Sequence, residues 1–257
     1  MNFTLTIICS IAFAFLMTAL GAALVFCFQK EFSPKLNAAF FGLASGIMLA
    51  AAIWSLLLPA FSQLETTWGR YAFAPIAVSF LLGAGFLYAL DKILLHTQGG
   101  NSQNEQKAKK LFVAMTVHNI PEGLAAGFAF GAAFSIGTPA ALVSAIGLAL
   151  GLGVQNVPEG AAVSLPMYTV YKKKKRAFLC GVLSGAVEPL FAVLGFFLAA
   201  QIAVLQPWLL AFSAGTMLFV IAEDLLPDSK TEGSGALGAW SAVFGFVLMM
   251  ILDVALG

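Results

Sequence analysis

The chain has 257 residues, of which 60% are hydrophobic and 10% are charged, with a formal net charge of +1. Soluble globular domains carry about 25% charged residues. The composition therefore excludes a soluble protein and indicates an integral membrane protein.

Eight apolar stretches follow one another along the chain with few charged residues inside them. Each is long enough to cross a bilayer as a helix, which takes about 20 residues. The sequence therefore predicts an all-α, polytopic membrane protein with a single domain over residues 1–257. The eight predicted transmembrane helices span residues 3–28, 36–61, 71–95, 111–135, 138–170, 177–201, 207–228 and 236–256.

The basic residues orient this predicted bundle. If both chain termini lie outside, 12 of the 13 Lys and Arg residues fall in cytoplasmic connections and Arg70 alone stays outside, which satisfies the positive-inside rule. The run Lys172–Arg176 is then explained as a topology anchor in contact with the lipid bilayer, and we expect no nucleic-acid partner. The polar segment 96–110 is rich in Gly, Asn and Gln and is expected to be a flexible cytoplasmic loop.

The predicted helices 36–61 and 207–228 share a sequence pattern. The first contains SGIML at 45–49 and LLP at 57–59, and the second contains AGTML at 214–218 and LLP at 225–227. In the topology above, these two helices cross the membrane in opposite directions. The pattern therefore favours an inverted repeat of the kind found in many transporters.

A hexapeptide occurs twice inside apolar surroundings, as HNIPEG at 118–123 and as QNVPEG at 155–160. His118 and Glu122 are four residues apart, so they share a helix face and can bind one ion together. Pro121 has no N–H, which leaves the carbonyl group of Val117 without its helical donor and kinks the helix. Because a carboxylate is costly to bury in a membrane, two such motifs predict a site on a transport path.

A third predicted helix, 177–201, also carries a carboxylate beside a proline, at Glu188-Pro189. Three helices thus each hold one intramembrane Glu without a Lys or Arg at comparable depth, which requires cations. Imidazole, carboxylate and amide ligands suit Zn²⁺, Fe²⁺, Mn²⁺ or Cd²⁺. The metal is expected as the transported substrate, and no prosthetic group is expected.

Other functions stand beside this one. Each Glu, Pro or His taken alone could be structural, but their joint occurrence argues against that explanation. An intramembrane metalloprotease would need an HExxH motif, and Asn119 follows His118, so we expect no enzyme. A proton-coupled carrier or a channel for another cation remains an alternative, because kinked helices and buried acids fit it too.

The two hexapeptides, Glu188-Pro189 and the eight-helix pattern resemble the ZIP family of divalent metal transporters, and the short loops and the QNVPEG form resemble its bacterial GufA-like branch. The resemblance implies two adjacent metal positions. The first would use His118, Glu122, Gln155 and Glu159, with Met48 as a contributor. The second would use Asn119, Asn156, Glu159 and Glu188, with Glu122 as a bridge.

The resemblance further implies a homodimer in the bacterial inner membrane that imports metal, most of all zinc, into the cytosol. It also implies an elevator-type movement of helices 1, 4, 5 and 6 against helices 2, 3, 7 and 8. Many relatives have His at the position of Gln155, and close bacterial relatives have Asp at the position of Asn156. We therefore expect the second metal position to bind more weakly here than in an Asp-bearing relative.

Overall fold

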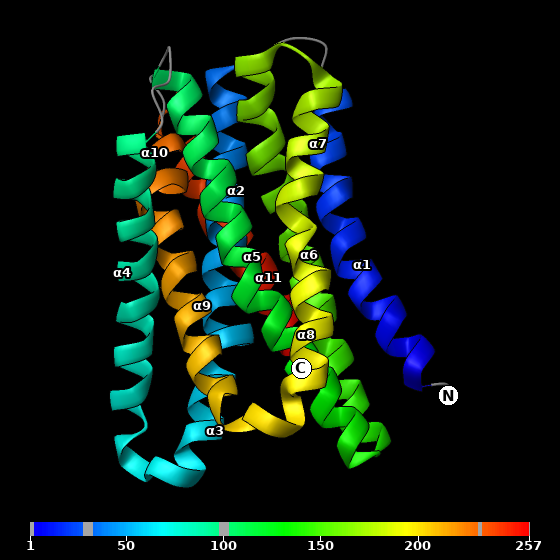
Figure 1. The fold of residues 1–257 in the computed structure, drawn as a ribbon. Coiled ribbons are helices and arrows are strands. Elements are labelled where there is room, and N and C mark those ends of the chain that lie inside the picture. The colour runs from blue at the N-terminus through cyan, green and yellow to red at the C-terminus, as the bar shows by residue number, and fades with distance from the viewer. Residues whose placement is uncertain (1–2, 28–32, 98–102, 231–232, 257) are drawn as a thin grey trace.

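The computed structural model describes residues 3–27, 33–97, 103–230 and 233–256, and helices with short turns form all of this part of the chain (Figure 1). The described residues make eight helical passes. Three of these are built from more than one segment. The passes are α1 (Phe3–Ala23), α2 (Pro34–Ala51) with α3 (Leu58–Trp68), α4 (Phe73–Thr97), α5 (Gln103–Ile136), α6 (Pro139–Tyr171), α7 (Lys174–Gly185) with α8 (Val187–Ile202), α9 (Gln206–Val220) with α10 (Leu226–Asp228), and α11 (Leu237–Leu256).

Seven of these passes are long and apolar enough to cross a membrane. The pass that falls short is α5, in which His118, Asn119 and Glu122 lower the hydropathy of a helix of 34 residues. The predicted all-α, polytopic fold is confirmed. The expected kink positions are realised differently: Pro121 and Pro158 lie inside continuous helices, whereas the sixth pass is interrupted at Ala186.

The expected loop over 96–110 is wrong for most of its described residues. The helix α4 continues to Thr97 and α5 begins at Gln103, while residues 98–102 lie outside the described part of the chain. The start of α5 is helical because its lysines have partners: Lys109 pairs with Glu105 one turn earlier, and Lys107 pairs with Asp228 of α10. In Figure 1, α10 and the start of α7 lie at one end of the bundle, and both chain ends lie toward the other.

The sequence repeat is also a repeat of backbone structure. A π-helical segment, Ala52–Leu57, joins α2 to α3, and a second one, Ile221–Leu225, joins α9 to α10. Each π-helical segment is followed by a helix that begins with Leu-Pro. Because π-helical turns are rare in proteins, their occurrence at matching positions supports the inverted repeat.

The packing of the helices follows the same repeat. The most extensive contacts pair α2 with α11, α4 with α9, α1 with α6, and α5 with α8. If α2 corresponds to α9, the pair α2–α11 corresponds to α9–α4. A Cβ atom on Gly46 of α2 would lie 1.9 Å from the Ala242 carbonyl oxygen of α11, and one on Gly215 of α9 would lie 2.0 Å from the Phe80 carbonyl oxygen of α4. Glycine permits the same close approach in both pairs.

Candidate metal centre

The two hexapeptides lie side by side on α5 and α6, and the first turn of α8 completes the group. The seven polar side chains that these segments contribute are all buried, with exposed fractions of 2% or less. They are His118, Asn119, Glu122, Gln155, Asn156, Glu159 and Glu188. The structure thus brings together every predicted site residue on these three helices.

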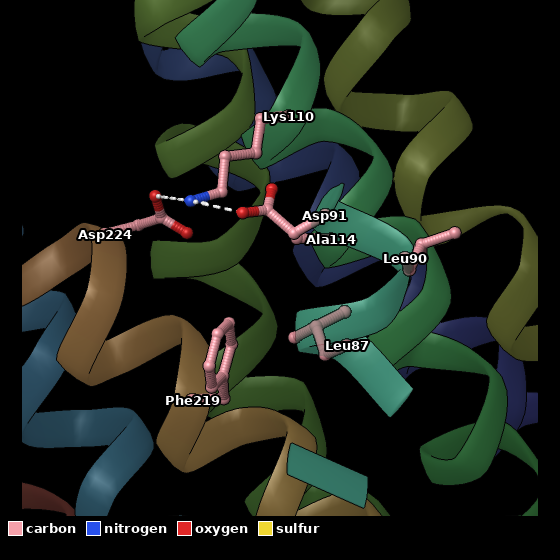
Figure 2. A pocket seen from close by; sticks show the side chains of 7 residues that line it. All are labelled: Leu87, Leu90, Asp91, Lys110, Ala114, Phe219 and Asp224. Atoms are coloured by element: carbon pink, nitrogen blue, oxygen red, sulfur yellow. Dashed lines mark ion pairs between the residues drawn. The ribbon is translucent and has the colours of Figure 1, made fainter. Parts of the chain in front are cut away.

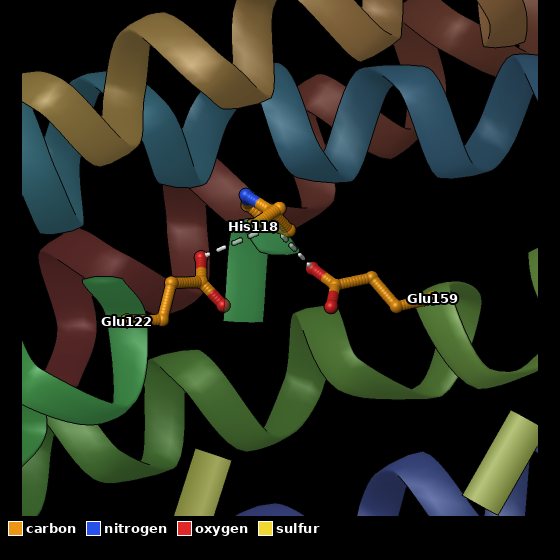
Figure 3. Close-up of side chains that lie close together, drawn as sticks. All are labelled: His118, Glu122 and Glu159. Carbon is orange, nitrogen blue, oxygen red and sulfur yellow. Dashed lines mark hydrogen bonds and ion pairs between the residues drawn. The ribbon is translucent and has the colours of Figure 1, made fainter. Parts of the chain in front are cut away.

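His118 lies between two carboxylates, as Figure 3 shows. Its Nε2 atom is 3.5 Å from Glu122 Oε1 and 3.4 Å from Glu159 Oε1. One ligand atom from each of the three side chains lies within 4.8 Å of the others. This arrangement of one imidazole and two carboxylates matches the first predicted metal position and could hold a divalent transition metal ion.

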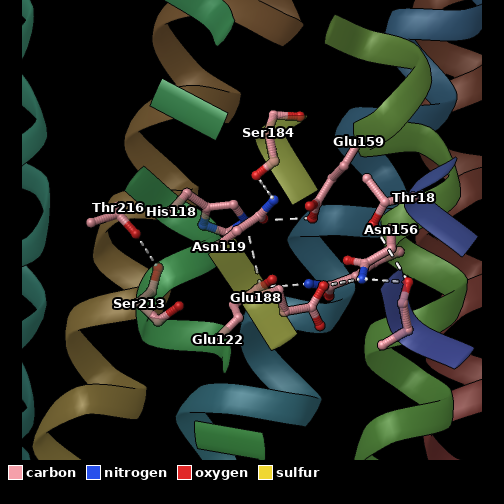
Figure 4. Close-up of polar contacts among 12 residues, drawn as sticks. Thr18, His118, Asn119, Glu122, Asn156, Glu159, Ser184, Glu188, Ser213 and Thr216 are labelled. Atoms are coloured by element: carbon pink, nitrogen blue, oxygen red, sulfur yellow. Dashed lines mark hydrogen bonds and ion pairs between the residues drawn. The ribbon is translucent and has the colours of Figure 1, made fainter. Parts of the chain in front are cut away.

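Amide groups hold the carboxylates in place from both sides. Gln155 Nε2 donates a hydrogen bond to Glu122 Oε1, and Asn156 Nδ2 donates one to Glu188 Oε2 at 2.6 Å. Asn119 Nδ2 donates to the Ser184 carbonyl oxygen at 2.9 Å (Figure 4). Asn156 Nδ2 also donates to the Ala14 carbonyl oxygen at 3.1 Å. Because a carbonyl oxygen can only accept, each asparagine must turn its own side-chain oxygen away from these backbone partners.

Six of the seven site residues keep one buried polar atom that has no hydrogen-bond partner among the described residues. All six atoms are potential metal donors. They are His118 Nδ1, Asn119 Oδ1, Glu122 Oε2, Gln155 Oε1, Asn156 Oδ1 and Glu159 Oε2. Buried polar atoms are nearly always paired, and leaving one unpaired costs about 1–3 kcal/mol. A group of unpaired lone pairs inside an apolar bundle therefore indicates a cation site.

The glycine of each hexapeptide lets a neighbouring helix come close to the site. A Cβ atom on Gly123 would lie 2.3 Å from the Glu188 carbonyl oxygen of α8, and one on Gly160 would lie 2.0 Å from the Thr18 carbonyl oxygen of α1. Any side chain larger than hydrogen would therefore push the backbone of α8 or α1 away. The two glycines set the distance at which Glu188 and Asn156 meet.

Met48 is fully buried on α2 within the main hydrophobic cluster, next to which Val117 of α5 packs. Its role as a metal ligand stays a prediction. The sequence analysis did not identify the backbone partners at Ala14 and Ser184. Their only signal was the spacing of 37 residues between Asn119 and Asn156, which indicates equivalent roles but names no partner.

One further acid differs from the expectation that it is solvated near the end of the chain. Asp253 of α11 is partly buried, and Ser55 Oγ donates a hydrogen bond to its Oδ1 atom at 2.8 Å. The π-helical segment 52–57 turns Ser55 toward α11, a local geometry that the sequence pattern did not predict.

Comparisons with known proteins agree with this site. The family model described as ZIP zinc transporter matches residues 107–253, which include both hexapeptides. Human zinc transporter ZIP11 is 34% identical over 94% of this chain and 94% of its own length. Zinc transporter GufA of Myxococcus xanthus is 34% identical over 93% and 94%, and zinc transporter ZIPB of Bordetella bronchiseptica is 34% identical over 96% and 80%.

These matches extend over nearly the whole chain and are to transporters rather than enzymes. They confirm the predicted resemblance, including its GufA-like branch. The chain is an integral membrane protein that belongs to the ZIP family of zinc transporters.

Proposed function

We propose that this protein imports divalent transition metal ions into the cytosol, with zinc as the foremost substrate and iron, manganese and cadmium as further candidates. The observation that carries the proposal is the buried group of His118, Glu122 and Glu159, whose ligand atoms converge within 4.8 Å. The printed names of the relatives, all zinc transporters, favour zinc over the other metals. The metal is the substrate of the protein and not a resident cofactor.

Two adjacent metal positions form the proposed site. The first uses His118, Glu122, Gln155 and Glu159, with Met48 as a contributor. The second uses Asn119, Asn156, Glu159 and Glu188, with Glu122 as a bridge. The unpaired oxygen atoms of Asn119 and Asn156 support the second position, because their amide nitrogens are held by backbone carbonyl groups.

The proposed movement is of the elevator type. The passes α1, α5, α6 and α7–α8 form the transport unit, which moves against a frame of α2–α3, α4, α9–α10 and α11. The main packing pairs support this division, because α1 packs on α6 and α5 on α8, while α2 packs on α11 and α4 on α9. We further propose a homodimer in a bacterial inner membrane with both termini outside.

The membrane potential suffices to drive such import. Moving one elementary charge through 100 mV is worth about 2.3 kcal/mol, so a divalent ion gains about 4.6 kcal/mol on entering a negative cell interior. Since about 1.4 kcal/mol corresponds to a factor of ten, this supports about three decades of accumulation. No ATP-binding loop of the GxxxxGK[ST] type occurs in the sequence.

Uptake of radioactive zinc into proteoliposomes tests the proposal. The wild type is compared with Glu122→Ala, which removes a central carboxylate, and with Glu65→Gln, which changes an exposed acid on α3. We expect saturable uptake in the wild type and in Glu65→Gln, and none above empty liposomes in Glu122→Ala. Proton or sodium flux with no zinc uptake in the wild type would instead favour the carrier or channel for another cation.

A further inference from the structure

A group of ion pairs lies at the end of the bundle that holds α10, apart from the metal centre. Lys110 Nζ of α5 is 3.2 Å from Asp91 Oδ2 of α4 and 3.2 Å from Asp224 Oδ1 of the π-helical segment 221–225 (Figure 2). Glu223 Oε1 lies 3.6 Å from the same nitrogen. The side chains of Lys110, Asp91 and Asp224 are 15%, 12% and 6% exposed, so this group is largely removed from solvent.

The ion pairs close this end of the bundle. With Lys110, Asp91 and Asp224, four apolar residues line a cavity of about 10 Å³, and these are Leu87, Leu90, Ala114 and Phe219. One water molecule needs about 10–15 Å³, so no hydrated ion can pass. Lys110, Ala114 and His118 follow one another at intervals of four residues, which places Lys110 about 12 Å along α5 from the metal centre.

The inverted repeat places a related contact at the opposite end. A Cβ atom on Gly83 would lie 2.1 Å from the Phe212 carbonyl oxygen, and one on Gly245 would lie 2.4 Å from the Leu43 carbonyl oxygen. These two contacts correspond to each other in the repeat that relates α4–α9 to α11–α2. Asp91 and Asp253 each follow their glycine by eight residues, so they occupy equivalent positions.

The two ends differ in how their aspartates are held. Asp253 accepts its hydrogen bond from Ser55, and both residues belong to the group of helices that contains α2 and α11. Asp91 and Asp224 belong to that same group, but their partner Lys110 lies on α5, which packs on α8. A second ion pair, between Lys107 of α5 and Asp228 of α10, crosses the same boundary. The ion pairs thus tie the two groups of helices together at one end alone among the described residues.

We propose that Lys110 is the gating cation of this end of the transport path, an inference that rests on the proposed function. While its ammonium group bridges Asp91 and Asp224, the path from the metal centre is closed and the two groups of helices cannot slide. Separating the ion pair would leave buried carboxylates without a counter-ion, which is costly. A divalent ion that leaves the centre lowers this cost because it supplies positive charge as Lys110 withdraws.

Thiol accessibility at Ala114 tests the gate, because Ala114 lines the closed cavity one turn inside Lys110. The probe is Ala114→Cys in a background in which Cys9, Cys27 and Cys180 are replaced by Ser, reconstituted in lipid nanodiscs. The measured quantity is the rate of reaction with a charged methanethiosulfonate. Lys110→Gln should raise this rate at least about tenfold, which corresponds to about 1.4 kcal/mol. Lys110→Arg, which keeps the charge, should leave it low.

Lys109→Gln is the matched control, since Lys109 pairs with Glu105 on its own helix and crosses no boundary. Equal rates in Lys110→Gln and Lys109→Gln would overturn the gate. If Lys110→Gln does not fold, Asp91→Asn decides: a rise in the rate supports the gate, and an unchanged rate overturns it.

Zinc uptake by the same proteins separates this inference from the proposed function. Zinc uptake by the wild type together with an unchanged thiol rate in Lys110→Gln overturns the gate and leaves the function standing. A raised thiol rate without zinc uptake by the wild type supports the gate and contradicts zinc as the substrate.

Discussion

Asn119 and Asn156 make equivalent hydrogen bonds on opposite sides of the metal centre. Asn119 Nδ2 donates to the Ser184 carbonyl oxygen at 2.9 Å, and Asn156 Nδ2 donates to the Ala14 carbonyl oxygen at 3.1 Å. Both amide oxygens stay unpaired among the described residues. Because the repeat relates the packing of α5 on α8 to that of α6 on α1, the two bonds are one device used twice. It anchors a helix and presents an oxygen atom to the centre.

Asn156→Asp should strengthen metal binding and weaken the metal-free protein. The added negative charge favours a divalent ion, but an ionised aspartate cannot donate to Ala14 or Glu188, and the loss of these buried partners costs about 1–3 kcal/mol. We expect tighter zinc binding by titration calorimetry, and a lower Tm without metal that rises more on zinc addition than in the wild type. The control is Asn37→Asp, at a partly buried position near the start of α2. Unchanged zinc affinity and stoichiometry in Asn156→Asp would contradict the assignment of Asn156 as a ligand.

Gly123→Ala should destabilise the protein through a contact between backbones. The added Cβ would lie 2.3 Å from the Glu188 carbonyl oxygen, so α8 must move, and such overpacking costs about 1–3 kcal/mol. Gly85→Ala on α4 is the matched control, because no atom lies within 4 Å of its Cβ position. There the change should be stabilising by about 0.5–1 kcal/mol, since alanine is the better helix residue. Thermal unfolding in detergent measures both, and shifts of the same sign would contradict this packing.

Zinc binding should weaken as the pH falls. Imidazole and carboxylate groups must lose their protons to bind metal, so protons compete with zinc for His118, Glu122 and Glu159. For each proton that zinc displaces, the Kd should rise by up to about tenfold per pH unit in the range where the ligand is protonated. Zinc titrations between about pH 7.5 and about pH 5.5 measure this slope. Tighter binding on acidification would contradict competition at these ligands.

Much of the fold could be predicted because membrane helices leave a strong signal. Apolar length marked every pass, and the matching patterns at 45–59 and 214–227 indicated the inverted repeat. The boundary at Gln103 was missed because the polarity of 103–110 resembles that of a loop. That segment is helical through ion pairs with residues more than a hundred positions away in the chain, such as Asp228, which no local pattern reveals.

The same division applies to the site. The residues of the two hexapeptides and Glu188 could be named from the sequence, because polar groups inside apolar helices stand out. The partners of Asn119 and Asn156 could not, since a backbone carbonyl group carries no residue-type signal. The pairing of Asp253 with Ser55 was missed because it depends on a π-helical turn.

The most direct test of the metal centre is the X-ray absorption spectrum of zinc bound to the purified protein, recorded for the wild type and for His118→Gln. The chain has two histidines, His118 and His96, and only His118 belongs to the proposed site. We predict one imidazole ligand together with oxygen ligands in the wild type, and loss of the imidazole signal in His118→Gln. An imidazole signal that persists in His118→Gln, or a wild-type spectrum without one, would contradict zinc binding between Glu122 and Glu159.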